Sequence, residues 1–428
     1  MRVCFTHLGC KLNQAEIEAM ARRFTAAGHH LVGSPGAADL HVVNTCTVTQ
    51  TAARESRKTV RGGLRANPNL RTVVTGCWSA AEPGAAAALD GVDLVVPNGE
   101  KESLFERVAA AFPELAVPET EPDPVLVPWV AMEMGHTRAL VKVEDGCNMQ
   151  CAFCIIPQTR GRQRSRPPGE VVAEVQALAR AGCREVVLTG VQISAYRSEG
   201  LDLADLVAQV LAESDAPRLR LTSIAPWELD DRLLDLFAEH GGRRLCRHFH
   251  LSLQSGCSAT LRRMRRPYTA ESYLDLLARV RQAVPEVAIT TDVLVGFPGE
   301  TTAEFEASLA TVAAAGFAKV HVFPFSPRPG TAAAGMPGQV PAQEKKERTA
   351  RMLQVAAAAE RRFLEEQVGR RVTVLWERPR GEQAHGLTDN YLRVYCRTDR
   401  DLWNRFVAAE VVGLAEGTPG GVMGELRA

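Results

Sequence analysis

The stretch Glu144-Asp145-Gly146-Cys147-Asn148-Met149-Gln150-Cys151-Ala152-Phe153-Cys154 carries three cysteines with the spacing CxxxCxxC. It directly follows a short apolar run at 139–143 whose composition predicts a β-strand. That strand is the first of six that alternate with helical patterns, which predicts an open or partial (βα) barrel rather than a small doubly wound sheet. Because the active sites of such barrels lie at the C-terminal ends of the strands, the cysteine loop stands where chemistry is expected.

Hydrophobic periodicity predicts the other elements of this central region. The expected strands span 139–143, 185–189, 218–223, 248–253, 288–294 and 319–325. The expected helices between them span 169–181, 203–213, 230–240, 270–284 and 303–315. His248 and His250 alternate within the fourth strand, and we expect them to be ordinary strand residues.

Two further regions flank the barrel. Strands at 2–6, 40–44 and 71–75 alternate with helices at 15–27, 52–66 and 101–111, which predicts a parallel α/β domain of the Rossmann or flavodoxin type. A helix at 342–368 precedes Val-rich alternating segments at 371–377, 391–397 and 406–413, which predict a small antiparallel β-barrel. Prolines between 113 and 128 predict an extended linker. The expected α/β architecture therefore has four parts: 1–125, 126–340, a connecting helix at 341–369, and 370–428.

Composition narrows the class of protein. Lys plus Arg and Asp plus Glu number 50 each, so a polyanion would have to be bound by local patches of charge. No stretch of about 20 apolar residues predicts a membrane span. The first residues predict a strand rather than a signal peptide. The chain has 11 cysteines, and this odd number argues against a framework of disulfide bonds. We therefore expect a cytoplasmic protein whose cysteines ligate metal rather than form disulfides.

The CxxxCxxC loop suits an iron–sulfur cluster. Three thiolates within eight residues can ligate three irons of a cubane cluster, which normally takes four ligands, so one iron would stay open to bind a small molecule. A structural zinc site is an alternative, but it needs four protein ligands, and no fourth His or Cys stands nearby in the sequence. Three buried, unligated cysteines are the other alternative.

A second group of cysteines is dispersed along the first domain. Cys10, Cys46 and Cys77 each follow one of its three predicted strands. The C-terminal ends of parallel strands open onto one edge of a sheet, so these thiols can converge. Gly9 and Gly76 allow the tight turns that this requires. The alternative is three ordinary buried cysteines, which is the role we expect for the remaining five: Cys4, Cys183, Cys246, Cys257 and Cys396.

The motifs together resemble one known family over essentially the whole chain, the radical S-adenosylmethionine methylthiotransferases. The similarity rests on residues 8–16 (LGCKLNQAE), 43–47 (VNTCT), 75–77, 144–166 (EDGCNMQCAFCIIPQTRGRQRSR), 188–196 (LTGVQISAY), 250–256 (HLSLQSG), 264–269 (MRRPYT), 291–300 (TDVLVGFPGE) and 325–331 (FSPRPGT). Residues 386–394 (GLTDNYLRV) look like part of a TRAM module, a small RNA-binding β-barrel.

Within this family the sequence motifs are most similar to those of the branch that acts on N6-threonylcarbamoyladenosine at tRNA position 37. Segments 8–16 and 188–196, and the pairing of LSLQSG with MRRPYT, carry that similarity. The branch for N6-isopentenyladenosine would more usually start Tyr-Gly-Cys-Gln-Met-Asn, and the branch for a ribosomal-protein aspartate Gly-Cys-Pro-Lys-Asn. Both branches remain alternatives, as do a radical enzyme with a single cluster and a non-enzymatic RNA-binding electron carrier or scaffold.

The resemblance implies a division of labour between the two cysteine groups. Cys147, Cys151 and Cys154 would hold a 4Fe–4S cluster that cleaves S-adenosylmethionine to an adenosyl radical. Cys10, Cys46 and Cys77 would hold a second 4Fe–4S cluster that presents the inserted sulfur. A first S-adenosylmethionine would methylate that sulfur. The adenosyl radical would then remove hydrogen from C2 of the adenine, and the methylthio group would take its place. The implied partners are the tRNA anticodon loop, a one-electron reductant of the flavodoxin or ferredoxin type and a sulfur donor, with no membrane.

Further contacts are expected from position along the chain. Residues near the strand ends are candidates to contact S-adenosylmethionine: Phe153, Thr189, Gly190, Gln192, Gln254, Asp292 and Gly296. The glycines among them have a simpler alternative role in turns. Acid-free basic groups and one segment of the tail are candidates to contact RNA: Arg160, Arg162, Arg164, Arg166, Arg262, Arg265, Tyr391 and Arg393. A basic helix face at 54–65 is either a further contact or a solvated surface.

Overall fold

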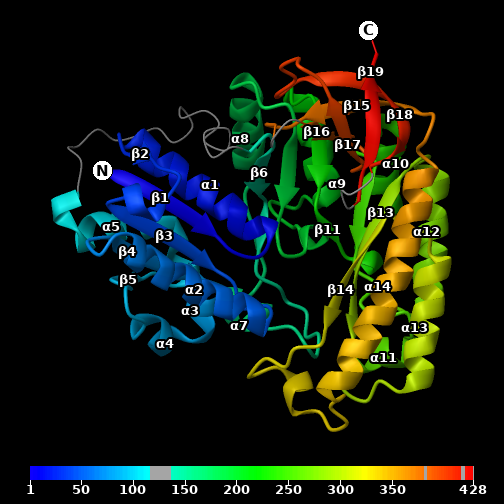
Figure 1. Cartoon of the computed structure of the whole chain (residues 1–428), viewed down its shortest axis with the longest axis horizontal. Helices are drawn as coiled ribbons and strands as arrows, with labels where there is room; N and C mark the ends of the chain where they lie inside the picture. The colour runs from blue at the N-terminus through cyan, green and yellow to red at the C-terminus, as the bar shows by residue number, and fades with distance from the viewer. Residues whose placement is uncertain (116–135, 380–382, 416–419, 428) are drawn as a thin grey trace.

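The computed structural model describes residues 1–115, 136–379, 383–415 and 420–427. Its first region is a five-stranded parallel sheet of order β2-β1-β3-β4-β5. This is the strand order of flavodoxin-like doubly wound sheets. The strands are β1 Arg2–His7, β2 His30–Leu31, β3 Leu40–Thr45, β4 Arg71–Gly76 and β5 Leu94–Val95, and the helices are α1 Lys11–Ala26, α2 Gln50–Ala66, α3 Cys77–Ala81, α4 Pro83–Ala87 and α5 Leu104–Ala111 (Figure 1).

The three longer strands of this sheet match the predicted ones to within a residue. The edge strands β2 and β5 were not predicted, because two residues are too few to show a period. Helix α1 begins at Lys11, earlier than the expected 15, and its first turn already contains the buried Leu12. Most of the predicted proline linker falls at 116–135, outside the described residues.

The central region is an open (βα) barrel, as predicted. Its consecutive strands pair in parallel in two arcs, β10-β9-β6 and β11-β12-β13-β14, because the predicted strand at 218–223 is interrupted at Thr222. The strands are β6 Ala139–Lys142, β9 Val186–Thr189, β10 Leu219–Leu221, β11 Ser223–Ile224, β12 His248–Leu251, β13 Ala288–Val295 and β14 Lys319–Pro324. The helices are α8 Pro168–Arg180, α9 Leu203–Glu213, α10 Asp231–His240, α11 Ser258–Arg263, α12 Ala270–Ala283 and α13 Thr302–Ala314.

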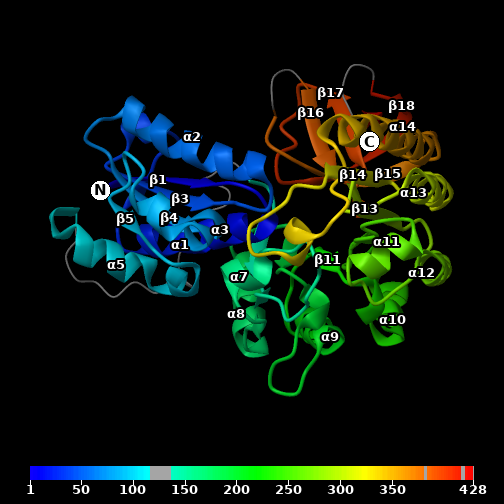
Figure 2. The same cartoon turned by 90° about the horizontal axis from the view of Figure 1, so that it is seen from below.

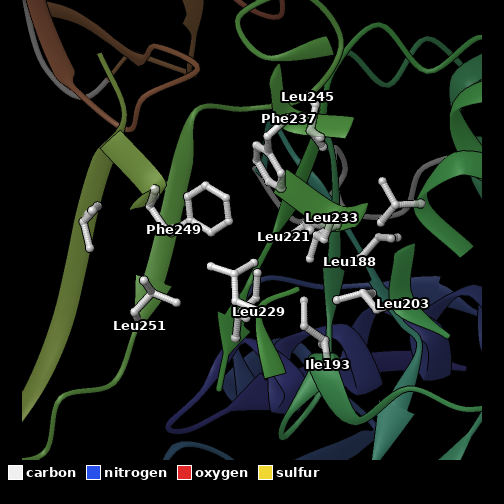
Figure 3. Close-up of a cluster of buried hydrophobic side chains, with 14 of the residues drawn as sticks. Leu188, Ile193, Leu203, Leu221, Leu229, Leu233, Phe237, Leu245, Phe249 and Leu251 are labelled. Atoms are coloured by element: carbon white, nitrogen blue, oxygen red, sulfur yellow. The ribbon is translucent and has the colours of Figure 1, made fainter. Parts of the chain in front are cut away.

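An apolar core joins these strands to the helices outside them. Figure 3 shows side chains from β9, β10 and β12 packed against residues of α9 and α10. The rings of Phe237 and Phe249 lie 4.2 Å apart at their centres, and both are buried. Burial of each such side chain stabilises the fold by about 1.5–3 kcal/mol, so the layer holds the strand ends in fixed positions.

The chain ends in a closed five-stranded barrel of order β15-β16-β17-β19-β18. Helix α14 Ala342–Glu365 leads to it along β14 and α13. Four strand pairs are antiparallel, but β17 and β19 are parallel, which corrects the expected all-antiparallel barrel. β16 and β19 were missed because Gly386 and Gly424 interrupt their alternation. The strands are β15 Arg371–Trp376, β16 Gln383–Leu387, β17 Arg393–Arg397, β18 Phe406–Leu414 and β19 Val422–Leu426.

This terminal barrel packs against the N-terminal ends of the central strands (Figures 1 and 2). Arg218 and Arg220, which flank the start of β10, donate to the carbonyls of Leu387 and Thr388 at 3.0 Å. Arg247, just before β12, pairs with Asp389 at 2.7 Å. The opposite, C-terminal face of the central strands is therefore left to the cysteine loop and the first domain. Among the helices described, none is both long and apolar enough to cross a membrane.

Candidate active site

The CxxxCxxC loop follows β6 and carries hydrogen-bond donors aimed at its sulfurs. The Met149 backbone N–H donates to Cys147 Sγ at 3.4 Å, and Arg266 Nη1 donates to Cys151 Sγ at 3.2 Å. Cys147 Sγ also lies 3.6 Å from Gln192 Oε1 at the end of β9. Burial raises the pKa of Cys154 to about 12, and the neighbouring thiols add to this effect. Such donors stabilise sulfur that carries negative charge, as it does in a metal-bound thiolate.

Arg266 is held by three aromatic rings. Its guanidinium carbon lies 5.1 Å from the ring centre of Trp227, 5.7 Å from that of Tyr268 and 6.0 Å from that of Phe153. Trp227 and Tyr268 stack on each other at 5.7 Å. Cation–π contacts of this kind fix the guanidinium in place, so its hydrogen bond to Cys151 is pre-organised. The sequence offered no sign of this role, because Arg266 lies far along the chain from Cys151.

The second cysteine group also meets at one edge of its sheet. Cys10 follows β1, Cys46 follows β3 and Cys77 opens α3 directly after β4. Burial raises the pKa of Cys46 to about 11, and the thiols of Cys77 and Cys10 raise it further. Gly9 packs so closely on Cys46 that an added Cβ would lie 2.6 Å from its Sγ. The predicted convergence of these three strand ends is therefore present.

Gly76 makes the turn that presents Cys77. Its φ is 104°, in the region that favours glycine. An added Cβ would lie 2.6 Å from Asn44 Oδ1 and closer still to the backbone of Thr45. Glycine is thus required here for both conformation and space.

The two cysteine groups lie on adjoining elements. Helix α7 Ile156–Arg160, which follows the CxxxCxxC loop, packs against α3, which begins at Cys77. The Asn98 amide spans the two elements, because its Nδ2 donates to the Thr159 carbonyl at 2.7 Å and lies 3.8 Å from Cys77 Sγ. The contact between α3 and α7 therefore links the two cysteine groups.

The donor sets fit cubane clusters better than single ions. Within the described residues, no three His, Cys, Asp or Glu side chains are arranged to hold one metal ion. A cubane cluster is larger than an ion, so its thiolate ligands stand further apart. Each group offers three thiols, and the first has N–H and guanidinium donors on its sulfurs. The three thiols of the CxxxCxxC loop could therefore hold three irons of such a cluster.

Comparisons with known proteins agree with this arrangement. Residues 141–312 match the Radical SAM superfamily, and residues 2–97 match Uncharacterized protein family UPF0004. The chain is 34% identical over 427 residues to the threonylcarbamoyladenosine tRNA methylthiotransferase MtaB of Bacillus subtilis, covering 96% of this chain and 93% of the relative. The MtaB of Chlamydia pneumoniae is 37% identical, with 90% and 89% covered.

The chain belongs to the radical SAM methylthiotransferase family. It is also 34% identical to the tRNA-2-methylthio-N(6)-dimethylallyladenosine synthase of Staphylococcus epidermidis, covering 86% of this chain and 74% of that relative. Among solved structures, the radical S-adenosylmethionine methyltransferase TsrM of Kitasatospora setae matches with a TM-score of 0.57 at 18% identity, covering 78% of this chain and 77% of that one. This second likeness concerns the fold alone.

The candidate contacts to S-adenosylmethionine fall into two places in this methylthiotransferase. Thr189, Gly190 and Asp292 line a cavity of about 510 Å³ inside the central barrel, together with Cys10 and Tyr391. Gln192 lies at the cysteine loop, and its Nε2 donates to Glu228 at 3.0 Å. Phe153 lies against Arg266, as described above. Gln254, three residues after β12, has a φ of 64°, an unusual conformation outside glycine.

Gly296 has a different environment. Its N–H donates to Glu300 Oε2 at 2.8 Å, and an added Cβ would collide with the side chain of Lys345. Its φ is 71°. These contacts account for Gly296 through the simpler alternative, a turn glycine against α14, and its expected contact with the cosubstrate stays a prediction.

Glu144 is a site residue that sequence reasoning missed. Its Oε2 accepts the backbone N–H groups of Val191 at 2.8 Å and Gln192 at 2.9 Å, which ties the cysteine loop to the loop after β9. An added Cβ at Gly190 would lie 2.7 Å from the same oxygen, so this glycine makes room for the carboxyl. Burial raises the pKa of Glu144 to about 8.

Arg160 was wrongly expected to contact RNA. Its side chain is only 1% exposed and pairs with Glu16 at 2.8 Å and with Asp145 at 2.9 Å. A guanidinium enclosed by two carboxylates cannot reach a phosphate on the surface. The spacing of the motif could not indicate this ion pair, because Glu16 lies far from Arg160 in the sequence.

The other candidate RNA contacts divide by exposure. Four are exposed: Arg162, Arg164, Arg262 and Arg265. Arg166 is half-buried and pairs with Glu174 at 2.6 Å. Tyr391 and Arg393 line the barrel cavity rather than the outer surface, and Arg393 lies 3.4 Å from Glu377. None of these contacts with RNA is tested by the geometry.

Proposed function

We propose that this methylthiotransferase inserts a methylthio group at C2 of N6-threonylcarbamoyladenosine at position 37 of tRNA. The observation that carries this is that the two groups of three thiols are joined by the contact between α3, which begins at Cys77, and α7, which follows the Cys147–Cys154 loop. Relatives that match most of the chain are named for this substrate, which supports it over the alternatives. The relative named for dimethylallyladenosine supports the same chemistry on isopentenyladenosine as the second candidate.

Each thiol group has its own task in this proposal. Cys147, Cys151 and Cys154 hold a 4Fe–4S cluster that, when bound, supplies the electron for cleavage of S-adenosylmethionine. Cys10, Cys46 and Cys77 hold a second 4Fe–4S cluster, which presents sulfur. The chain fixes the distance between them through α3 and α7 and excludes bulk water with Phe153 and the aromatic rings around Arg266.

RNA binding falls to the surface around the cysteine loop and to the C-terminal barrel. The exposed Arg162, Arg164, Arg262 and Arg265 supply local positive charge on a chain with no net charge. We assign the TRAM role to the closed barrel at 370–428. The boundaries between the four parts of the chain lie near residues 125, 340 and 369. A flipped adenosine would be bound by stacking and hydrogen bonds, as single-stranded RNA usually is.

The remaining partners follow from the chemistry. A flavodoxin- or ferredoxin-type protein supplies single electrons, and a sulfur donor replaces the sulfur that is inserted. Because the substrate is tRNA and the thiols must stay reduced, we infer a cytoplasmic location.

The decisive experiment is mass spectrometry of tRNA nucleosides from a strain that lacks this gene. We expect the methylthio derivative of N6-threonylcarbamoyladenosine to disappear and its unmethylthiolated precursor to accumulate. Complementation with the unaltered gene should restore it, whereas Cys151→Ala and Cys77→Ala should not. Unchanged levels in the deletion strain, with loss of the isopentenyl derivative instead, would move the assignment to the second candidate.

Iron content and product release separate the other classes. Reconstituted enzyme should hold about eight irons per chain, and replacement of Cys10, Cys46 and Cys77 by alanine should remove about half. A one-cluster radical enzyme would hold about four irons from the start. An electron carrier or scaffold would release no 5′-deoxyadenosine on reduction with S-adenosylmethionine.

A further inference from the structure

The cavity inside the central barrel is lined by one lysine that has no ionic partner among the described residues. Lys11 follows Cys10 and lines the cavity together with residues of β9, β12, β13 and the C-terminal barrel. Of the other charged groups on the wall, Lys319 pairs with Glu360 at 3.2 Å and Arg393 with Glu377 at 3.4 Å, while Asp292 Oδ2 lies 3.2 Å from His250 Nε2. Within the described residues, no carboxylate lies within ion-pair distance of Lys11.

Lys11 is held in position by an aromatic stack. Its Nζ lies 5.2 Å from the ring centre of Tyr391, which in turn stacks on His248 at 4.5 Å. The Lys11 side chain remains accessible although protein surrounds it, because it faces the cavity.

The electrostatics of this wall favour an anion. Burial lowers the pKa of His248 well below its usual range, and the positive charges of Arg220 and Lys11 lower it further. Lys11 also opens α1, whose first turn contains no acidic residue, so the helix dipole adds to the positive potential. A negatively charged group beside Lys11 would relieve this excess of positive charge.

The wall of this cavity also carries polar side chains. His250, Thr290 and His321 line the cavity beside Asp292. His250 Nδ1 lies 3.0 Å from Thr290 Oγ1. A carboxylate, a hydroxyl and a urea can form hydrogen bonds to such a wall, whereas a hydrocarbon substituent such as an isopentenyl group cannot.

We propose that Lys11 binds the threonyl carboxylate of N6-threonylcarbamoyladenosine and thereby selects this substrate. The inference rests on the proposed function and adds the residue that determines its specificity. The threonyl carboxylate is the one charge on the modified base, and Lys11 adjoins Cys10, whose cluster presents sulfur.

The test uses anticodon stem-loops that differ only at position 37. One carries N6-threonylcarbamoyladenosine, one carries its threonyl methyl ester and one carries adenosine. Binding to the reconstituted enzyme is measured by fluorescence anisotropy for the unaltered protein, Lys11→Gln and Lys11→Arg. Lys346→Gln, an exposed lysine on α14 that does not line the cavity, is the matched control.

We expect the unaltered enzyme to bind the acid about 10- to 100-fold more tightly than the ester, as a hydrogen bond between charged groups would give. In Lys11→Gln this preference should vanish, and Lys11→Arg should keep most of it. Lys346→Gln should behave as the unaltered protein. Iron content of each variant shows whether the neighbouring Cys10 still loads its cluster.

Several outcomes overturn the proposal. The unaltered enzyme could fail to distinguish acid from ester, or Lys11→Gln could retain the preference. Equal loss of affinity for all three RNAs in Lys11→Gln would assign Lys11 to a backbone phosphate instead. Failure of the proposed function looks different, because the unaltered enzyme would then bind and methylthiolate an isopentenyladenosine stem-loop in preference to the threonylcarbamoyl one.

Discussion

Arg160 Nη1 lies 2.8 Å from Glu16 Oε1, and this buried ion pair joins the helices that follow the two cysteine groups. Glu16 belongs to α1, which begins after Cys10, and Arg160 ends α7, which follows Cys154. Lys101 Nζ donates to the other oxygen of Glu16 at 2.6 Å. Burial alone would raise the pKa of Glu16, but Lys101 and Arg160 together hold it far below its usual range. The pair therefore stays ionised and sets the relative position of the two domains.

Replacement of Arg160 should destabilise the fold strongly. Arg160→Ala leaves the Asp145 carboxylate without its nearest cation and the buried Glu16 with Lys101 alone, and we expect a loss of about 3–5 kcal/mol in the free energy of unfolding. Arg164→Ala is the matched control, because Arg164 is 56% exposed and lies 3.7 Å from the same Asp145. The control should cost at most about 1 kcal/mol. Urea denaturation of both variants measures the difference, and equal effects would contradict the role of the buried pair.

Gly76 offers a second test of how the thiols are placed. Gly76→Ala forces a Cβ against Thr45 and Asn44 in a conformation that alanine disfavours. We expect a loss of about 2–4 kcal/mol and a fall in iron bound by the Cys10, Cys46 and Cys77 group.

The control for this change is Gly84→Ala in α4, where an added Cβ meets nothing within 4 Å. Alanine is favoured over glycine in helices, so this variant should be as stable as the unaltered protein or slightly more so. Thermal unfolding and iron analysis of the two variants would separate them. Normal iron content in Gly76→Ala would show that the turn is not required.

Much of the fold follows from local pattern. The strands that were predicted correctly are buried runs such as 71–76, and the cysteines were located because each follows such a run. Two kinds of element escaped prediction. β2 and β5 have two residues each, and β16 gains its place only because Gly386 lets the backbone of Leu375 approach closely. These depend on pairing partners that local sequence does not contain.

The roles of the other side chains at the site were harder to predict than the positions of the cysteines. Arg160 and Arg266 both belong to basic groups near the cysteine loop, and local charge gave no means of telling them from exposed arginines. Their partners, Glu16 for Arg160 and Cys151 for Arg266, lie more than a hundred residues away in the chain. Only the packed structure shows that one arginine is structural and that the other contacts a thiol.

The C-terminal barrel should detach more readily in acid, and Glu377 is one cause. It lies 2.7 Å from Arg138, just before β6, and 3.3 Å from His385 in β16. Burial alone would raise the pKa of Glu377, but His385, Arg138 and Arg393 lower it to about 2. A carboxyl with a depressed pKa stabilises the folded state above its unfolded pKa, and this contribution is lost as the pH falls from about 4.5 to about 2.

Glu377→Gln should therefore reduce the free energy of unfolding at neutral pH by about 3 kcal/mol, with a smaller difference at about pH 3. Glu306→Gln on α13 is the control, since Glu306 pairs with Arg351 at 2.6 Å on the surface and should matter little. Denaturation of the three proteins at both pH values gives the comparison. A difference that does not shrink in acid would show that Glu377 acts through packing rather than charge.

Arg266 should tune the cluster held by the CxxxCxxC loop. Its positive charge and its hydrogen bond to Cys151 Sγ favour the reduced cluster, which carries one more negative charge. Removing one charge-assisted hydrogen bond costs about 1.4 kcal/mol, which for one electron corresponds to about 60 mV. We therefore expect Arg266→Met to make the reduction potential more negative by about that amount, with Arg266→Lys giving a smaller shift.

An EPR-monitored redox titration in a background that lacks Cys10, Cys46 and Cys77 isolates the single cluster. Arg263→Met is the control, because Arg263 pairs with Glu304 at 2.6 Å and donates to Thr260, with no sulfur among its partners. An unchanged potential in Arg266→Met, or an equal shift in Arg263→Met, would show that the bond to Cys151 positions the loop without acting on the electron.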